Sequence, residues 1–218
     1  MFTSALICGS LAIAADTTPF LPDSAVCTCC RIFNGFKELQ TVIAKSQYED
    51  KTYYFCSKEC KAQFDNNPEF YIELPLPRPA PEFTLPNLGS SLDSLSRYRG
   101  KLVLVDFWAT WCAPCVKTMK DLQSMYIQFT ADSLVVLGIS LDTLGNPKVP
   151  EHVQKQRVTY QILFDSRTQP TWLAYGAKSV PSLFLVDGKG MIVRQWRGAT
   201  DKDEIAAAIR EFLSDHSQ

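Results

Sequence analysis

The sequence predicts an α/β protein that follows a smaller, cysteine-rich α+β module. After residue 82, apolar strands alternate with helix-forming segments, which is typical of a layered α/β fold. Five of the eight cysteines lie between Cys27 and Cys60. The segment "LPLPRPAPEF" at 74–83 carries prolines at alternate positions, which favours an extended linker and excludes a helix. We therefore assign 26–73 to the cysteine-rich module, 74–81 to a Pro-rich linker and 82–218 to the α/β module.

The amino-acid composition and net charge limit the functions that are expected. The 218 residues are 46% hydrophobic and 21% charged, as in a globular protein that is large enough for two cores. The net charge of −1 gives no electrostatic reason for nucleic acid to be the main partner, so nucleic acid binding is not expected.

Residues 1–15 have features of a signal peptide. The run "SALICGSLAIAA" is apolar and short, and Ala12 and Ala14 stand where an A-x-A cleavage site would have them. We expect an exported, for instance periplasmic, protein with a linker at 16–25. The basic n-region is missing, so a mobile tail is the alternative. Membrane association is expected only if the leader remains uncleaved or is lipidated. Cleavage would leave seven cysteines, an odd number, so full pairing within one chain is impossible.

The cysteine-rich module has its own pattern of elements. Residues 41–48 and 52–55 flank a polar "EDK" turn and predict a hairpin. Ser57 is a helix N-cap for "SKECKAQFD", and Asn67 with Pro68 starts a further short helix. About 50 residues bury too little surface for a comfortable core, so reinforcement is expected.

The α/β module shows strand and helix patterns in alternation. Strands are expected at 102–108, 134–141, 161–164, 182–186 and 192–196, and helices at 113–131, 151–157, 171–175 and 202–213.

Cys112 and Cys115 form a C-x-x-C motif at the junction of the 102–108 strand and the next helix. Unpaired amides and the positive end of a helix stabilise a thiolate, and Pro114 fits the first turn because no amide hydrogen is needed there. We expect Cys112 to attack a substrate disulfide and Cys115 to resolve the mixed disulfide. A structural bridge is the alternative. A zinc clip would need two further ligands, and none is evident nearby.

Asp106 lies within the apolar 102–108 strand, where a carboxylate is costly. We expect burial to raise its pKa so that it exchanges a proton with Cys115. A hydrogen-bonded polar residue without a catalytic role is the alternative.

The stretches "APEFTLPNLGSSLDSLSRYRGKLVLVDFWATWCAPC", "LGISLD" and "SVPSLFLVDGKGMIVRQWRG" resemble the TlpA/ResA-like thiol:disulfide oxidoreductases of the thioredoxin superfamily. The resemblance implies a thioredoxin-like fold, in which helices flank a central mixed sheet. It also implies a cis peptide before Pro181, and a substrate site formed by Trp111, Ala113, Pro114 and Val180. Client proteins with disulfides and an upstream dithiol donor would be the partners, and the redox pair needs no cofactor.

Some residues depart from related patterns. Many TlpA/ResA-like proteins carry an acidic residue three positions after the second cysteine and Asn in the strand, where this chain has Thr118 and Asp106. A thiol peroxidase would need Pro and Thr ahead of its cysteine, in the pattern P-x-x-x-T-x-x-C. Val105 and Ala109 stand there instead, which argues against a peroxidase.

Cys27, Cys30, Cys56 and Cys60 form two close pairs separated by the predicted hairpin, as a tetrahedral thiolate site requires. The stretch "TYYFCSKECKAQFDNNPEFY" resembles YHS/TRASH-type modules, which implies a treble-clef-like fold and binding of zinc, copper or another soft metal. A purely structural zinc and oxidation to disulfides both remain open. In "CTCC", either Cys29 or Cys30 is available as a ligand.

Together these patterns predict an exported oxidoreductase that reduces client disulfides and carries a tethered thiolate metal site. The alternative is a protein that handles copper or another metal, in which the redox domain keeps the cysteine-rich module reduced.

Overall fold

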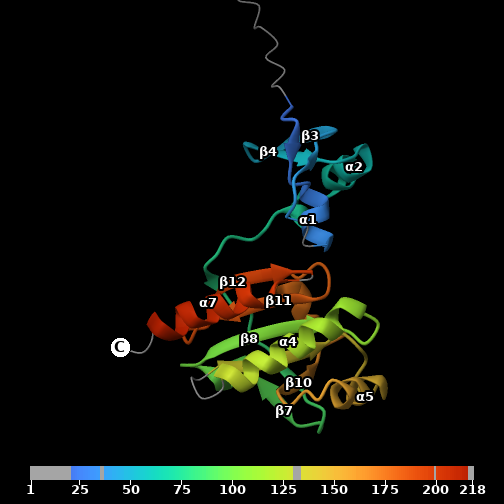
Figure 1. The fold of residues 1–218 in the computed structure, drawn as a ribbon. Coiled ribbons are helices and arrows are strands. Elements are labelled where there is room, and N and C mark those ends of the chain that lie inside the picture. The colour runs from blue at the N-terminus through green and yellow to red at the C-terminus, as the bar shows by residue number, and fades with distance from the viewer. Residues whose placement is uncertain (1–20, 35–36, 130–133, 199, 216–218) are drawn as a thin grey trace, which may run out of the picture.

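The computed structural model describes residues 21–34, 37–129, 134–198 and 200–215. The predicted signal peptide at 1–15 lies outside these ranges. Figure 1 shows the cysteine-rich module as a separate body above the sheet of the α/β module, joined to it by an extended segment. No described helix is both long enough and apolar enough to cross a membrane.

The cysteine-rich module consists of short elements. Its strands and helices are β1 Ser24–Ala25, α1 Thr28–Asn34, β2 Gln40–Thr41, β3 Ala44–Tyr48, β4 Lys51–Phe55, α2 Lys58–Asn66 and α3 Pro68–Tyr71. The pairing of β3 with β4 confirms the predicted hairpin. The Ser57 hydroxyl accepts a hydrogen bond from the Cys60 amide at 3.1 Å, which confirms the predicted cap of α2. Sequence patterns missed α1, because seven residues of "TCCRIFN" show no helical periodicity.

Phe64 of α2 is the centre of the small core. Its ring lies 4.7 Å from that of Tyr53, 5.2 Å from that of Phe55 and 6.0 Å from that of Tyr71 between centroids. Ile32, Cys27 and Cys29 complete the buried set. This core is small, in keeping with the expectation that the module needs reinforcement.

The α/β module is built on a six-stranded sheet in the order β10-β9-β8-β11-β12-β5. The strands are β5 Arg78–Pro79, β8 Leu102–Trp108, β9 Leu134–Ser140, β10 Gln161–Phe164, β11 Ser182–Val186 and β12 Met191–Arg197. The pairs β8 with β9 and β9 with β10 are parallel, whereas β11 is antiparallel to both β8 and β12. The sheet is therefore mixed, as the resemblance implied.

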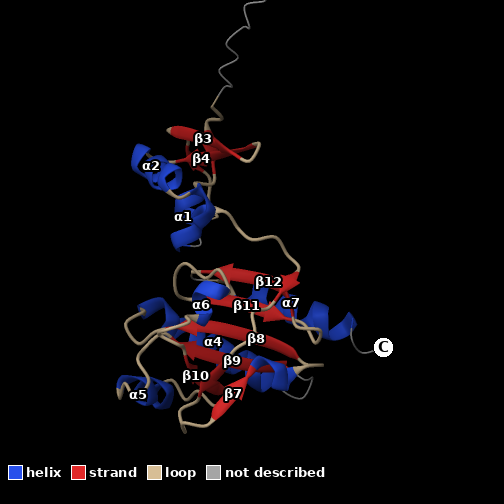
Figure 2. Ribbon diagram, turned by 180° about the vertical axis from the view of Figure 1, so that it is seen from behind, coloured by secondary structure: helices blue, strands red, loops and turns tan. Residues whose placement is uncertain are grey.

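Helices cover both faces of this sheet (Figure 2). The helices are α4 Ala113–Phe129, α5 Lys148–Lys155, α6 Thr171–Ala174 and α7 Lys202–Asp215, with a 3-10 turn η1 at Leu95–Tyr98. Even-numbered residues of β8, such as Leu104 and Trp108, share one core with α4 and α7. Odd-numbered residues, such as Val105 and Phe107, share the other core with Tyr175 and Leu95. This alternation follows from the two-residue repeat of a strand.

In the linker and the α/β module, three differences from the predicted elements affect the sheet and its connections. Arg78 and Pro79, inside the predicted linker, form the edge strand β5 against β12, so this segment also extends the sheet. The helix expected at 151–157 begins earlier, at Lys148, because Pro150 lies in its first turn, where no amide hydrogen is needed. A hairpin of β6 Thr84–Pro86 and β7 Leu92–Ser94 had no sequence prediction. The module boundaries themselves stay predictions.

The two modules contact one another at the loop before Pro181. Lys178 Nζ donates to the carbonyl oxygens of Glu69 and Ile72 at 3.2 Å each, and also to that of Phe70. Ser179 Oγ lies 3.5 Å from the Ile32 carbonyl oxygen. The cysteine-rich module is therefore seated beside the loop that leads into β11.

Candidate active site and cysteine cluster

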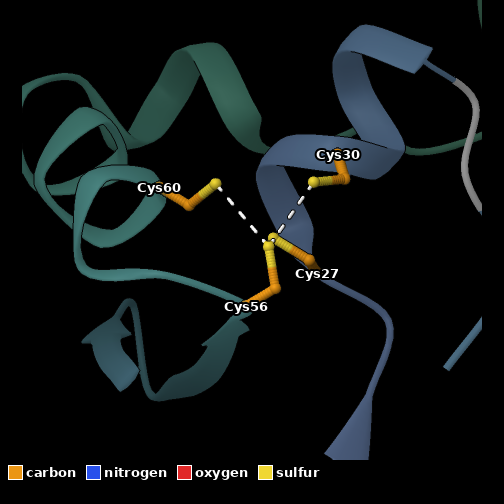
Figure 3. Close-up of side chains that lie close together, drawn as sticks. All are labelled: Cys27, Cys30, Cys56 and Cys60. Carbon is orange, nitrogen blue, oxygen red and sulfur yellow. Dashed lines mark hydrogen bonds between the residues drawn. The ribbon is translucent and has the colours of Figure 1, made fainter. Parts of the chain in front are cut away.

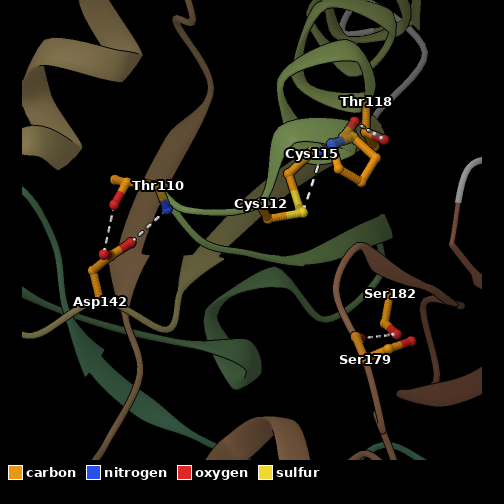
Figure 4. Close-up of a disulfide and its surroundings, with 8 residues drawn as sticks. Thr110, Cys112, Cys115, Thr118, Asp142, Ser179 and Ser182 are labelled. Atoms are coloured by element: carbon orange, nitrogen blue, oxygen red, sulfur yellow. Dashed lines mark hydrogen bonds between the residues drawn. A yellow bond between two sulfur atoms is a disulfide. The ribbon is translucent and has the colours of Figure 1, made fainter. Parts of the chain in front are cut away.

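The C-x-x-C pair lies where β8 ends and α4 begins. Cys112 precedes α4, Cys115 lies in its first turn, and the two sulfur atoms form a disulfide with a Cα–Cα distance of 5.4 Å. The amide of Cys115 donates to Cys112 Sγ at 3.3 Å (Figure 4). That amide would also stabilise a Cys112 thiolate once the disulfide is reduced.

Exposure distinguishes the residues around the pair. Cys112 is 6% exposed and Cys115 is 1% exposed, so Cys112 is the more accessible cysteine but is itself largely covered in the disulfide form. Trp111 is 71% exposed directly before the pair. Ala113 is also exposed, as is Pro114, whose carbonyl oxygen lies 3.4 Å from Thr118 Oγ1. An exposed ring beside a recessed disulfide provides an apolar contact for an incoming protein chain.

Asp142 holds the segment that leads into Cys112, and sequence patterns did not single it out. Its carboxylate accepts from the Thr110 amide at 2.8 Å and from the Thr110 hydroxyl at 2.7 Å (Figure 4). Ser140 Oγ and Asn146 Nδ2 donate to the same carboxylate, each at 3.0 Å. One sequence feature could have identified Asp142. It follows the buried 134–141 strand directly, and burying a carboxylate without a partner there would cost free energy.

The predicted cis peptide between Val180 and Pro181 is confirmed. It precedes β11, whose first residue Ser182 is paired with Phe107 near the end of β8. Ser182 Oγ donates to the Ser179 carbonyl oxygen at 2.7 Å, and this turn lies across from the disulfide in Figure 4. The structure thus brings the Val180–Pro181 turn and the Cys112–Cys115 pair to the same end of the sheet.

Asp106 is completely buried in the middle of the sheet. The strand repeat places it on the same face as Trp108, in the core that also contains Cys115. Neither of its oxygens has a hydrogen-bond partner among the described residues, which argues against the alternative of a hydrogen-bonded structural carboxylate. Burial raises the pKa of Asp106 to about 8.

The four cysteines predicted as metal ligands lie together in the small module (Figure 3). Their Sγ atoms all lie within 4.8 Å of one another. Cys56 Sγ is 3.7 Å from Cys30 Sγ and 4.0 Å from Cys60 Sγ. A tetrahedral zinc–thiolate site has sulfur atoms about 3.8 Å apart, because each Zn–S bond is about 2.3 Å long. The cluster therefore has ligands of the type and spacing that fit a soft metal ion.

Cys29 does not belong to this cluster, which separates the two possibilities in "CTCC". Its Sγ donates to the Cys60 carbonyl oxygen at 3.0 Å and the residue is 2% exposed. Burial raises the pKa of Cys29 to about 12, and the nearby Cys60 adds to the shift. Cys29 is therefore a buried thiol of the small core, and all five described cysteines of this module are free thiols.

The cluster thiols influence one another electrostatically. Burial, followed by hydrogen bonding with Cys27, raises the pKa of Cys56 to about 11. Burial also raises the pKa of Cys27, but hydrogen bonds from Cys30 and Cys56 outweigh this effect and leave the pKa below its ordinary value. Several thiolates at this spacing repel one another, so a bound cation is the natural counter-charge.

A mixed sheet with a C-x-x-C disulfide at a helix N-terminus beside a cis-proline turn defines a thioredoxin-fold thiol-disulfide oxidoreductase. Residues 76–195 match the AhpC/TSA family and residues 35–74 match the YHS domain. The chain belongs to the AhpC/TSA family. The YHS match includes Cys56 and Cys60 but begins after Cys27 and Cys30, so half of the cluster lies outside it.

Named relatives agree with this class. The thiol-disulfide oxidoreductase ResA of Geobacillus thermodenitrificans is 31% identical over 128 residues, which are 58% of this chain and 71% of the relative. The thioredoxin-like protein YneN of Bacillus subtilis is 30% identical, with 58% and 74% of the two chains covered.

Solved structures give the same fold. A Chlorobium tepidum protein described as a thiol:disulfide interchange protein DsbE is 28% identical with a TM-score of 0.57, over 66% of this chain and 99% of the other. The thioredoxin domain of a thiol-disulfide oxidoreductase from Bacteroides vulgatus is 25% identical with a TM-score of 0.58, over 65% and 99%.

Proposed function

We propose that this protein reduces disulfides of client proteins outside the cytoplasm, with Cys112 as nucleophile and Cys115 as resolving thiol. The hydrogen bond from the Cys115 amide to Cys112 Sγ is the observation that carries the assignment of roles. This hydrogen bond favours the thiolate form of Cys112. Cys115 is the more buried of the two residues, which favours its neutral thiol form. The apolar leader pattern of residues 4–15 supports export.

The exchange takes place in two steps. The Cys112 thiolate attacks a client disulfide, which forms a mixed disulfide and releases one client thiolate. Cys115 then gives its proton to ionised Asp106 and attacks Cys112 Sγ, which closes the Cys112–Cys115 disulfide and expels the second client thiolate. Asp106 and solvent return protons to the two client sulfurs. Two electrons pass to the client, and an upstream dithiol donor restores the reduced pair.

The substrate site of this proposal lies around the disulfide. Trp111, Ala113 and Pro114 would contact the client, while the backbone of Val180 beside Pro181 would bind it as an added strand. The exposure of Trp111 and the position of the Val180–Pro181 turn support this arrangement.

A Cys115→Ser variant tests the proposal directly, because a client that reacts with Cys112 would remain covalently attached. We expect trapped complexes that reducing agent releases, and no complexes in a Cys112→Ser control. Complexes formed equally in both variants would contradict the assignment of Cys112 as nucleophile.

We further propose that Cys27, Cys30, Cys56 and Cys60 hold a zinc or copper ion. A thiolate-bound metal supplies folding free energy to a module whose apolar core is small. The four residues come from the start of α1, the end of β4 and the first turn of α2, so they tie these segments together. Cys29 takes no part and stays in the apolar core.

A second candidate function is that the redox domain keeps the cysteine cluster reduced for metal handling. Its support is the contact of Lys178 and Ser179 with α3 and α1, which seats the cysteine-rich module next to the substrate-docking turn. Such tethering gives a high effective concentration. We expect a full chain with an oxidised cluster and a reduced Cys112–Cys115 pair to reduce its cluster at a rate independent of protein concentration. A rate proportional to concentration, or equal in Cys112→Ser, would contradict this function.

A further inference from the structure

Three buried polar groups without partners gather on the α4 face of the sheet. Among the described residues, no hydrogen bond is made by the Asp106 carboxylate, the Trp108 indole Nε1 or the Tyr160 hydroxyl. Asp106 and Trp108 are 0% exposed, and Tyr160 is 4% exposed. An isolated buried polar group of this kind costs free energy. Three of them in one core therefore call for a common explanation.

Gly138 of β9 is the point around which they meet. It is paired directly with Asp106 across the β8–β9 ladder. A Cβ atom on Gly138 would lie 3.1 Å from Tyr160 Cε2 and 3.3 Å from Trp108 Nε1. The missing side chain at Gly138 thus leaves space for the Tyr160 ring and the Trp108 indole, and also for Ile162, whose Cδ1 is the nearest atom at 2.7 Å. Trp108 follows Asp106 by two residues in β8 and shares its face.

The three groups are complementary in hydrogen bonding. Ionised Asp106 is an acceptor only, the indole N–H is a donor only, and the Tyr160 hydroxyl can donate. The charge of Asp106 also contributes to raising the pKa of Tyr160, after the larger effect of burial, so the two groups lie within electrostatic range although no hydrogen bond joins them in this structure. A donor that comes within hydrogen-bonding distance of a buried carboxylate favours its charged form.

We propose that Tyr160, together with the indole N–H of Trp108, stabilises ionised Asp106 and thereby sets the pH at which Asp106 exchanges a proton. Tyr160 is a positioning residue in this scheme, since it acts through Asp106 and not on the reacting sulfurs. Any effect of Tyr160 on proton transfer from Cys115 rests on the proposed role of Asp106 in the exchange. The effect of Tyr160 on the titration midpoint of Asp106 does not rest on that role.

The hydrophobic residues of this core include four that carry a titratable group. They are Tyr160, Tyr126, Cys112 and Cys115. Tyr126 of α4 meets the Tyr160 ring edge-on at 6.2 Å between centroids. Helix α7 contributes apolar residues, such as Ile205 and Ile209, to the buried part. The buried hydroxyl of Ser140 lies on the same face but donates to Asp142. Tyr160 therefore carries a buried hydroxyl of this core that has no partner among the described residues.

The test compares Tyr160→Phe with Tyr175→Phe in the full chain with its disulfide intact. Tyr175 is a matched control, since it is buried with an unpartnered hydroxyl but lies in the core on the opposite face of the sheet. The midpoint of Asp106 is followed by carbon NMR of the side-chain carboxyl and assigned with Asp106→Asn. We expect Tyr160→Phe to raise that midpoint by at least about 0.5 pH unit, because a donor to the ionised form is lost. Tyr175→Phe should leave it unchanged. An unchanged midpoint in Tyr160→Phe, or equal shifts in both variants, overturns the proposal.

A second measurement needs no substitution in this core. The chemical shift of the Trp108 indole N–H in the unmodified protein should change with pH at the same midpoint as that of the Asp106 carboxyl. An indole shift that does not change at that midpoint overturns the proposal. This result remains decisive even if Tyr160→Phe fails to fold. The pH profile of mixed-disulfide resolution is recorded separately. If Asp106→Asn leaves that profile unchanged, the role of Asp106 in the exchange fails, while the NMR midpoints still decide the role of Tyr160.

Discussion

Thr110 and Asp142 are joined by two hydrogen bonds, from the Thr110 amide at 2.8 Å and from its hydroxyl at 2.7 Å. This double contact ties the segment before the disulfide to the loop after β9. Because Trp111 and Cys112 follow Thr110 directly, the position of the redox pair depends on a carboxylate thirty residues further along the chain.

Asp142→Asn should slow client reduction and lower the free energy of unfolding by about 1–3 kcal/mol, since buried donors lose their charged acceptor. Asp187→Asn is the control. Asp187 accepts two amides, from Lys189 at 2.9 Å and Met191 at 2.8 Å, in the turn that follows the far end of β11. Denaturant unfolding and the rate of insulin disulfide reduction measure the two effects. Equal loss of reduction rate in both variants would mean that Asp142 acts only through general stability.

Asp106→Asn should stabilise the disulfide form near neutral pH. The pKa of Asp106 is raised to about 8 in the folded protein, so the folded state holds a proton that the unfolded state has already lost above about pH 4. Stability therefore falls as pH rises from about 4 to about 8, and the wild-type protein is destabilised by on the order of 4 kcal/mol at pH 7. Asn removes this penalty. Urea unfolding at pH 5 and pH 8 measures the free energy of unfolding of both proteins. The difference in this free energy between variant and wild type should be larger at pH 8 than at pH 5, and an equal difference would contradict the assigned pKa.

Cys30→Ser and Cys29→Ser form a matched pair for the metal site. Cys30 Sγ faces the cluster, whereas Cys29 Sγ donates to the Cys60 carbonyl oxygen, a hydrogen bond that a serine hydroxyl can also make. We expect Cys30→Ser to weaken zinc binding by more than about tenfold and Cys29→Ser to bind one zinc per chain like the wild type. Competition with a chromophoric chelator measures both affinities. Loss of zinc in Cys29→Ser alone would assign Cys29 as the ligand.

Glu73→Gln should loosen the contact between the modules. Arg197 donates to Glu73 at 3.0 Å and its side chain is 5% exposed, so removal of the carboxylate leaves a buried guanidinium without its charged partner. Hydrogen exchange of the α3 amides should become faster. Lys37→Gln, in the exposed Lys37–Glu204 pair, should change exchange little because exposed ion pairs contribute about 0–1 kcal/mol. Unchanged α3 exchange in Glu73→Gln would show that this ion pair does not hold the modules together.

The sequence by itself determined the elements whose signals are local. The run Leu102–Trp108 gave a buried strand, Pro114 fitted the first turn of α4, and Ser57 marked the start of α2, because each depends on neighbouring residues. The spacing of four cysteines likewise predicted a cluster, since two close pairs flanking a hairpin must meet when the hairpin forms.

Tertiary structure alone decided which groups meet from distant parts of the chain. Asp142 reaches Thr110, Tyr160 and Trp108 meet over Gly138, which is paired with Asp106 in the sheet, and Lys178 contacts α3. It also separated Cys29 from Cys30, because these consecutive residues of α1 direct their thiols in different directions, one to the core and the other to the cluster. Such contacts depend on the register of the strands and on how the helices pack on the sheet. The residues that set this register and packing lie far apart in the sequence, so no short stretch of sequence predicts these contacts.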